Sequence, residues 1–300
     1  MEDFSNILSE NARQIGELLN TLLSKHIEAG EISRPERLLA AMRHGVLNGG
    51  KRLRPFLVIQ TAALFDANYQ TAQRVGAALE CVHCYSLIHD DLPAMDNDDL
   101  RRGKPTVHKA FDEATAILAG DGLLTLAFDI LADEKTELSE KTRLTLIRAL
   151  ARASGIGGMV GGQALDLQAE TQKPDEHGIV TLQAMKTGAL IRYACEVGAI
   201  IGNATAEDRE RLSSFGAAIG LAFQLADDIL DITADTASLG KTAGKDITAD
   251  KATLVALRGI DWAKSQLTGL IEQAETLLQP FGKKADILRK TAEFVANRKN

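Results

Sequence analysis

Residues 84–96 read CYSLIHDDLPAMD, so that Asp90, Asp91 and Asp96 directly follow an apolar run. A second stretch, residues 220–231, reads GLAFQLADDILD and repeats this plan far along the chain. Carboxylates are rarely buried unless they are paired or bind a metal. Two such clusters at the ends of apolar helices therefore predict one acidic cavity that holds metal ions, which is the chemistry of binding a diphosphate.

The surrounding sequence favours helices. Hydrophobic residues make up 45% of the chain and aromatic residues only 4%, so the core must be built mainly from Ala, Leu, Ile and Val. No run of alternating β-branched residues indicates a sheet, and no long linker divides the chain. We therefore predict an all-α protein with one domain, 1–300, of roughly 10–13 helices. The clearest predicted helices cover residues 71–91, 111–133, 139–153, 158–170, 179–202 and 206–232.

Composition excludes several classes of protein. The formal net charge of -7 argues against a general nucleic-acid binder. Cys81, Cys84 and Cys195 form no disulfide framework, which favours a reducing compartment. The Cys-x-x-Cys spacing of the first two is shared by redox pairs and by half zinc sites. However, no second pair completes a zinc site, and no Gly or Pro lies between the two to make the turn of a redox motif. We therefore predict buried helical cysteines.

The same sequence predicts a cytoplasmic location. The N-terminus, MEDF, is acidic and does not resemble a signal peptide. Charged or amide residues such as Arg192, Glu196 and Gln224 interrupt the apolar runs before about 18 residues, so no membrane span is expected.

Spacing within each acidic motif predicts its geometry. Asp227 and Asp231 are four residues apart and share one helix face, with Asp228 turned aside. Pro93 ends the regular helix after Asp91, and the turn brings Asp96 back towards Asp90. Like charges about 4 Å apart repel by about 4 kcal/mol at an effective dielectric constant of about 20, so such a cluster needs cations. Mg²⁺ fits because it binds one or two carboxylates and completes its shell with water and phosphate oxygens. The alternative to a metal site is that each acidic motif is only a solvated helix end.

Two basic stretches supply the other half of a phosphate site. Residues 49–55, GGKRLRP, place Lys51 and Arg54 near a helix start, where phosphates are favoured. Arg101 and Arg102 follow the first acidic motif. Adjacent arginines usually point in different directions, so each can hold a different diphosphate by paired hydrogen bonds.

Together these motifs resemble the trans-prenyltransferases, the short-chain isoprenyl diphosphate synthases, over nearly the whole chain. Each motif is weak alone, but their joint order is specific. The resemblance implies the isoprenoid synthase fold, with helices around a central active-site cavity, and is closest to members that make fifteen-carbon farnesyl diphosphate. It rests on residues 50–55, on 86–106 with a first aspartate motif enlarged by two residues, on Gly158-Met159 with Gly162-Gln163, on Lys186-Thr187-Gly188, on Phe223-Gln224 leading into Asp227–Asp231, and on Gly240-Lys241.

The resemblance also implies residue roles. The metal ligands would be Asp90, Asp91 and Asp96 for two Mg²⁺ ions and Asp227, supported by Asp228 and Asp231, for a third, with Mn²⁺ as a possible substitute. The allylic diphosphate would be held by Arg101, Lys186 and Lys241. Isopentenyl diphosphate would be held by Lys51, Arg54, His83 and Arg102. Lys251, Arg298 and Lys299 would close over the site.

The implied reaction is ionisation, condensation and elimination. The allylic C–O bond ionises, the double bond of isopentenyl diphosphate attacks C1, and the departing pyrophosphate takes the proton. Gln224 and the oxygens of Lys186 and Thr187 would stabilise the cation. The segment Thr233–Asp250 would close to exclude water, with Gly240 and Gly244 allowing the movement. Tyr85, with its neighbour Ser86, would form the floor that limits product length, because it lies about 7.5 Å before Asp90 along the helix.

Several other functions remain open at this stage. A geranylgeranyl diphosphate synthase shares both acidic motifs. A terpene cyclase would not need Lys51 and Arg54, a non-catalytic prenyltransferase subunit would be expected to lose one acidic motif, and a metal-buffering protein would not explain the arginines. The resemblance also implies a homodimer.

Overall fold

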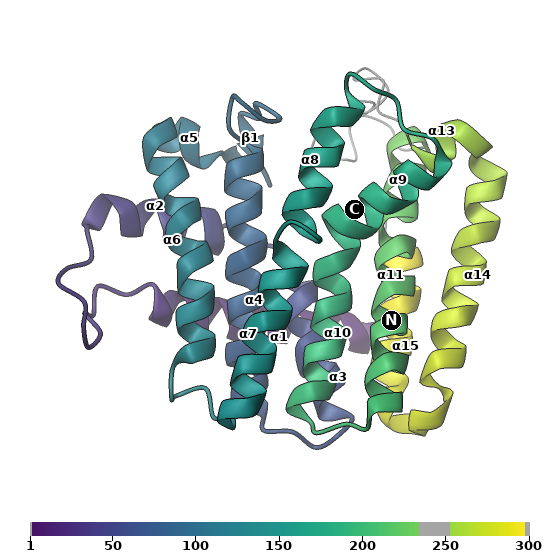
Figure 1. The fold of residues 1–300 in the computed structure, drawn as a ribbon, viewed down its shortest axis with the longest axis horizontal. Coiled ribbons are helices and arrows are strands. Elements are labelled where there is room, and N and C mark those ends of the chain that lie inside the picture. Colours follow the sequence, from purple (N-terminus) through teal and green to yellow (C-terminus); the bar gives the residue numbers. More distant parts are fainter. Residues whose placement is uncertain (1, 234–252, 298–300) are drawn as a thin grey trace. The chain divides into compact units, whose positions relative to one another are not determined.

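The computed structural model describes residues 2–233 and 253–297, and helices dominate this part of the chain (Figure 1). Its strands are confined to one hairpin, β1 (Leu100–Arg101) with β2 (Lys104–Pro105). The all-α prediction is therefore confirmed. The helices are α1 (Glu2–Leu22), α2 (Glu36–Leu47), α3 (Leu53–Ala63), α4 (Tyr69–Asp90), α5 (Val107–Ala110), α6 (Glu113–Ala132), α7 (Glu140–Ser154), α8 (Met159–Ala169), α9 (Glu176–Gln183), η1 (Ala184–Gly188), α10 (Ala189–Ile201), α11 (Ala206–Thr233), α13 (Leu254–Arg258), α14 (Ile260–Leu278), η2 (Gln279–Ala285) and α15 (Asp286–Ala296).

Most predicted helices agree with the structure to within two residues at each end. The exception is the segment 179–202, predicted as one helix. It consists of α9, a π-helical turn η1, and α10. A π turn bonds residue i to i+5 and is frequent at functional sites. It leaves no periodic signal in the sequence that would separate it from the α-helices on either side.

The chain groups into two compact units, and each is described by itself. The first contains Met1–Ile59 and Tyr69–Arg143, and the second contains Gln60–Asn68 and Leu144–Asn300. A single domain over 1–300 thus stays a prediction.

Helix α4 is the central element of the first unit. It packs against α6, α1 and α2, and side chains on every side of it are buried, from Val75 and Leu79 to Val82 and Ile88. A helix that is apolar all round belongs in a core, because no face of it is suited to water. Cys81 and Cys84 lie in this helix as buried free thiols, as predicted.

Helix α6 corrects the prediction that no apolar run is long enough to span a membrane. It has 20 residues and a mean hydropathy of 1.6 over its most apolar window, so by length and composition alone it could cross a bilayer. Asp121 and Asp129 interrupt the apolar run, but the mean hydropathy still reaches that of a membrane span. In the structure it lies against α4, α2 and α5, and 44% of its most apolar window is buried, including Ala119, Leu123 and Ala127.

Helix α11 is the central element of the second unit. It packs against α10, α14, α15 and η1. Two glycines allow the close approach of its neighbours: a Cβ at Gly216 would lie 2.7 Å from Cα of Arg192, and one at Gly220 would lie 3.0 Å from Cα of Gly188. Helix α11 is thereby held against η1 and α10, and it carries the second aspartate motif at its C-terminal end.

Candidate active site

The first aspartate motif lies where α4 ends. Asp90 is the last helical residue, and the chain then turns so that the amide of Asp96 donates to the carbonyl of Asp90 at 2.9 Å. The amide of Asp98 donates to the carbonyl of Asp91 in the same way, at 3.2 Å. The predicted return of Asp96 to Asp90 is confirmed, and the motif forms a compact turn instead of an extended loop.

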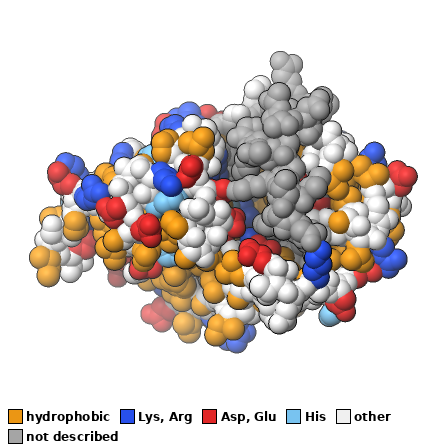
Figure 2. Space-filling model, turned by 90° about the horizontal axis from the view of Figure 1, so that it is seen from above, with side chains coloured by type: hydrophobic (Ala, Val, Ile, Leu, Met, Phe, Trp, Pro, Cys, Tyr) orange, Lys and Arg blue, Asp and Glu red, His pale blue; other side chains and the backbone are white. Residues whose placement is uncertain are grey.

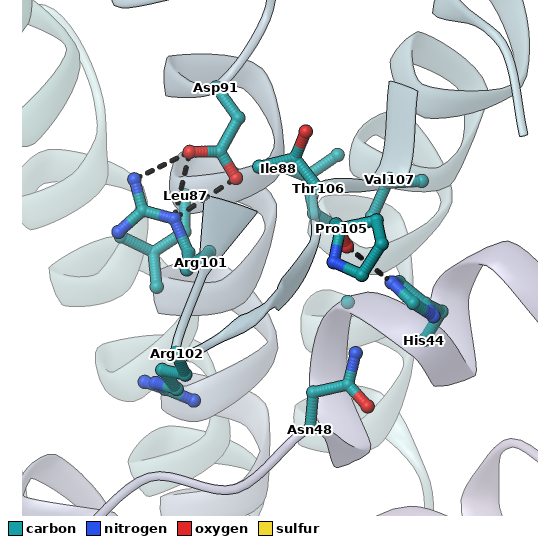
Figure 3. Close-up of a pocket in the computed structure, with 11 residues that line it drawn as sticks. His44, Asn48, Leu87, Ile88, Asp91, Arg101, Arg102, Pro105, Thr106 and Val107 are labelled. Carbon is teal, nitrogen blue, oxygen red and sulfur yellow. Dashed lines mark hydrogen bonds and ion pairs between the residues drawn. The ribbon is translucent and has the colours of Figure 1, made fainter. Parts of the chain in front are cut away.

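Asp91 is buried and paired with Arg101 (Figure 3). Nη2 of Arg101 lies 2.6 Å from Oδ1 of Asp91, and Nε lies 2.8 Å and 3.0 Å from the two carboxylate oxygens. Burial raises the pKa of the Asp91 carboxyl, and the guanidinium offsets part of that rise. The structure therefore joins a predicted metal ligand to a predicted diphosphate ligand.

The β1–β2 hairpin separates the two adjacent arginines. Arg102 and Gly103 have φ of 54° and 74°, which form the tight turn between the strands. Arg101 points to Asp91, whereas Nη1 of Arg102 donates to the carbonyl of Gly49. The prediction that they point in different directions is confirmed. Figure 2 shows the end of the helices that carries this hairpin, where red, blue and pale blue side chains lie together on the left of the view.

A small cavity of about 30 Å³ lies beneath the hairpin. Asp91, Arg101 and Arg102 line it, together with His44 of α2 and Asn48, which directly follows α2 (Figure 3). Its volume suits about one water molecule, so it is a polar gap beside the candidate site and too small for a prenyl chain.

The basic loop before α3 has an unusual backbone. Gly49, Gly50 and Arg52 have φ of 85°, 113° and 50°. A φ of 113° at Gly50 is one that residues with a side chain rarely adopt, and a Cβ there would also lie 2.6 Å from the Arg102 guanidinium. The loop places Lys51 on the surface and Arg54 in the first turn of α3, as the sequence predicted.

His83 stands among arginines. Its Nε2 lies 3.3 Å from Nη1 of Arg54. Burial lowers the pKa of His83 well below its ordinary value, and the positive charges of Arg54 and Arg102 lower it further. His83 is therefore neutral near pH 7. Nε of Arg54 is buried without a hydrogen-bond partner, so this cluster offers unused donor capacity to an anion.

Tyr85 and Ser86 lie between His83 and the acidic motif. The Tyr85 ring is buried and contacts the His89 ring edge to face, with centroids 5.7 Å apart. Burial raises the pKa of the Tyr85 hydroxyl. The hydroxyl of Ser86 donates to the carbonyl of His83 at 2.8 Å and is only partly buried. Tyr85 is thus the bulky apolar group of this part of α4.

In the second unit, the π turn carries Lys186 and Thr187. Nζ of Lys186 lies 2.6 Å from Oδ2 of Asp166 on α8, a residue that the sequence did not single out. A Cβ at Gly162 would lie 2.2 Å from the backbone nitrogen of Lys186, so α8 touches the π turn directly. Asp166 follows Gly162 by four residues on the same helix face, which is the signal that could have identified it.

The second aspartate motif is tied to this turn by hydrogen bonds. Asp228 is buried and accepts from Nε2 of Gln183 at 3.0 Å and from Nε2 of Gln224 at 3.1 Å. The hydroxyl of Thr187 donates to Oε1 of Gln224 at 3.1 Å. These bonds fix the orientation of the Gln224 amide. Asp228 is turned aside into the protein, as the helical spacing predicted.

The described residues contain no group of three or more His, Cys, Asp or Glu side chains placed to hold one metal ion among them. Magnesium does not need such a cage, because it binds through one or two carboxylates together with substrate phosphates. The donors at the ends of α4 and α11 are oxygen ligands only, which suits Mg²⁺ better than softer metals. Lys241, Gly240, Gly244, Lys251, Arg298 and Lys299 lie outside the described residues.

Aspartate-rich helix ends beside arginine-rich loops, on an all-α framework, are typical of prenyltransferases that bind diphosphates. Comparison with known proteins agrees. A family model described as polyprenyl synthetase matches residues 35–290. The chain belongs to this family.

Two bacterial relatives show the extent of the likeness. The farnesyl diphosphate synthase of Escherichia coli is 47% identical over 270 residues, covering 87% of this chain and 89% of its own. That of Haemophilus influenzae is 43% identical, covering 97% and 99%. Among solved structures, an FPP/GFPP synthase from Zymomonas mobilis has a TM-score of 0.87 and 47% identity, covering 98% of this chain and 99% of that one. The predicted isoprenoid synthase fold is thus confirmed.

The environment of His83 predicts a pH-dependent stability. The pKa of His83 in the folded protein lies below its value of about 6.5 in the unfolded chain. At a pH between these two pKa values, the unfolded state binds a proton that the native state does not. The free energy of unfolding should therefore decrease as the pH falls below about 6.5, and by less in His83→Gln. Urea midpoints between pH 8 and pH 5.5 measure this. His177→Gln, at an exposed position on α9, is the control. Parallel pH profiles for wild type and His83→Gln would contradict the assignment.

The contact between α8 and the π turn predicts the effect of one methyl group. In Gly162→Ala the new Cβ meets backbone, which cannot rotate away, so the turn with Lys186 and Thr187 must move. We expect a loss of about 1–3 kcal/mol in the free energy of unfolding and a fall in prenyltransferase kcat/KM of about tenfold or more. Gly269→Ala on α14, where nothing lies within 4 Å, should instead be neutral or stabilising. Unchanged kcat/KM in Gly162→Ala would show that the π turn tolerates displacement.

Proposed function

We propose that this chain is a Mg²⁺-dependent transferase that condenses isopentenyl diphosphate with dimethylallyl and geranyl diphosphates to give (2E,6E)-farnesyl diphosphate and pyrophosphate. The observation that carries the proposal is the identity of 47% and 43% to two farnesyl diphosphate synthases over most of the length of both chains. Chemical support comes from the two groups of predicted site residues, one in each compact unit.

In this proposal, isopentenyl diphosphate binds to the basic loop of the first unit. Lys51, Arg54 and Arg102 supply positive charge, and neutral His83 supplies a hydrogen bond. Support comes from the unused buried Nε of Arg54 and from the lowered pKa of His83 among these arginines. A diphosphate would relieve the repulsion between these cations, because its charge is opposite.

The allylic diphosphate is assigned to Arg101 and Lys186, with Lys241 as a further cation. Arg101 is paired with Asp91 and Lys186 with Asp166 in the structure. A bound diphosphate would take over these cations, because phosphate oxygens accept paired hydrogen bonds as carboxylates do. Asp91 would then be available to a metal ion.

The metal ligands in this proposal are Asp90, Asp91 and Asp96 for two Mg²⁺ ions and Asp227 for a third, with Asp228 and Asp231 supporting it. Asp228 already accepts two hydrogen bonds inside the protein, which suits a supporting role better than direct ligation. Bound Mg²⁺ would neutralise the charge that develops on the departing pyrophosphate.

The chain's own residues would then guide the cation left by ionisation. Gln224 is held by Thr187 and Asp228, so its amide oxygen is fixed before the reaction starts. A preorganised dipole stabilises developing charge without having to reorient. The final proton would go to the pyrophosphate, since His83 already contacts Arg54 and no other His or Glu of the predicted motifs is better placed.

A geranylgeranyl diphosphate synthase is the second candidate. One from Arabidopsis thaliana is 44% identical over 273 residues. The product would be decided by Tyr85, whose buried ring occupies the part of α4 that precedes the acidic motif.

We also propose that the protein works as a cytoplasmic homodimer. Support comes from α6, where Ile117 and Leu118 remain 45% and 56% exposed on a strongly apolar helix. A second copy of the chain would remove this apolar surface from water.

One incubation tests the function. Purified protein with Mg²⁺, isopentenyl diphosphate and geranyl diphosphate should release pyrophosphate and farnesyl diphosphate, and a chelator should abolish both. Asp90→Asn should lower kcat by about a hundredfold or more, because it removes charge from the metal site. The products are measured by chromatography after dephosphorylation. If no prenyl product formed, the proposal that this chain is a prenyltransferase would be refuted.

Replacement of the aromatic floor tests product length. Tyr85→Ala should shift the main product from fifteen carbons to twenty or more, because it removes a buried ring beside the acidic motif. Tyr69→Ala is the matched control, since Tyr69 begins the same helix but is 48% exposed. Its product should stay at fifteen carbons. A fifteen-carbon product from Tyr85→Ala would exclude Tyr85 as the floor.

A further inference from the structure

A fully buried ion pair lies behind the basic loop. Nη1 of Arg52 lies 2.7 Å from Oε1 of Glu80, and the two side chains are only 4% and 2% exposed. Burying a guanidinium and a carboxylate carries a large desolvation cost, and an apolar pair of the same size is often as stable. Neither side chain belongs to the diphosphate or metal ligands described above. Stability alone therefore does not explain why Arg52 and Glu80 form a buried ion pair.

The contacts of Arg52 indicate that reason. Its Nη2 donates to the carbonyl of Val46 in the last turn of α2, while Nη1 reaches Glu80 in the middle of α4. Its own carbonyl accepts from the amide of Phe56 in the first turn of α3. One side chain and its backbone thus join α2, α3 and α4 at the loop that carries Lys51 and Arg54.

The loop needs such a clamp because its backbone is strained. Arg52 has a φ of 50°, a left-handed conformation that costs a residue with a side chain about 1–2 kcal/mol. Gly49 and Gly50 also have positive φ, and glycines restrict the chain least. Without a tertiary contact, this stretch would sample many other conformations.

Glu80 is itself held in place. Sγ of Cys84 donates to its Oε1 at 3.8 Å. Burial and the nearby Glu80 carboxylate raise the pKa of the Cys84 thiol to about 12, so the thiol keeps its proton and stays a donor. Arg52 and Cys84 therefore both donate to one carboxylate oxygen from fixed positions.

We propose that Glu80 is a positioning residue: through Arg52 it holds the Gly49–Arg52 loop in its left-handed conformation. It thereby presents Lys51 of the loop and Arg54 of the first turn of α3 to the diphosphate of isopentenyl diphosphate. This inference rests on the proposed function for the identity of that ligand. Glu80 itself does not touch the substrate.

Glu80→Gln separates positioning from simple charge. The variant keeps the shape of the side chain and removes one negative charge near an anion site. If Glu80 acted only through its charge, the KM for isopentenyl diphosphate would fall, because repulsion is lost. If it positions the loop, that KM should rise about tenfold or more, with the KM for geranyl diphosphate changed less than about twofold. A lower or unchanged KM for isopentenyl diphosphate would overturn the proposal.

A double variant separates positioning from folding stability. Arg52→Met with Glu80→Leu leaves no unpaired buried charge, so the melting temperature should stay close to that of the wild type. The raised KM for isopentenyl diphosphate should persist, because the clamp on the loop is gone. If stability and this KM both returned to wild-type values, the pair would be structural only, and the proposal would be wrong.

Asp133→Asn is the matched control. Asp133 pairs with Arg74 of the same helix, α4, at 2.5 Å, far along the chain from the loop. The Asp133→Asn variant should lose stability without any change in either KM.

Calorimetric titration with inorganic pyrophosphate measures binding without turnover. Weaker binding to Glu80→Gln than to the wild type supports the proposal, even if the wild type made no prenyl product. Equal binding overturns it.

Discussion

The burial of α4 is the constraint on which the first unit depends. A helix surrounded by protein on all sides cannot carry a charged group without a partner, because the cost of removing the charge from water is too high. Yet α4 and the turn after it carry Glu80, His83 and Asp91. The structure meets this constraint with Arg52 beside Glu80, Arg101 beside Asp91, and a neutral His83. One arginine of the basic loop, Arg52, and one of the hairpin, Arg101, are therefore paired with charges of α4 and of the turn after it.

The second unit satisfies a related constraint by backbone packing. Gly162 on α8 and Gly220 on α11 both pack closely on the π turn: a Cβ would lie 2.2 Å from the Lys186 nitrogen at the first and 3.0 Å from Cα of Gly188 at the second. The turn is confined from two sides, and its Lys186 and Thr187 reach Asp166 and Gln224. Close backbone contact leaves little room for these side chains to move, which is how a site is preorganised before a substrate binds.

Much of this could be predicted from the sequence. The helices α4, α6, α7, α8 and α11 follow from apolar stretches of helix-favouring residues, because burial of apolar side chains is their main stabilisation. The return of Asp96 to Asp90, the divergence of Arg101 and Arg102, and the inward turn of Asp228 follow from local geometry. The apolar length of α6 and the π turn after α9 were not predicted. Two aspartates interrupt the apolar run of α6, and a π turn has no local sequence pattern.

The sequence by itself determined the helical class, the family and the residue types of the two acidic and two basic motifs, because these depend on composition and on short motifs. Only the tertiary structure decided which charges are paired. Arg52 with Glu80, Arg101 with Asp91, and Lys186 with Asp166 join segments 28, 10 and 20 residues apart. Such partners are selected by the packing of helices against one another, since a buried charge must pair with whatever group the fold brings within reach. The spacing of these residues along the chain does not by itself identify which charges pair.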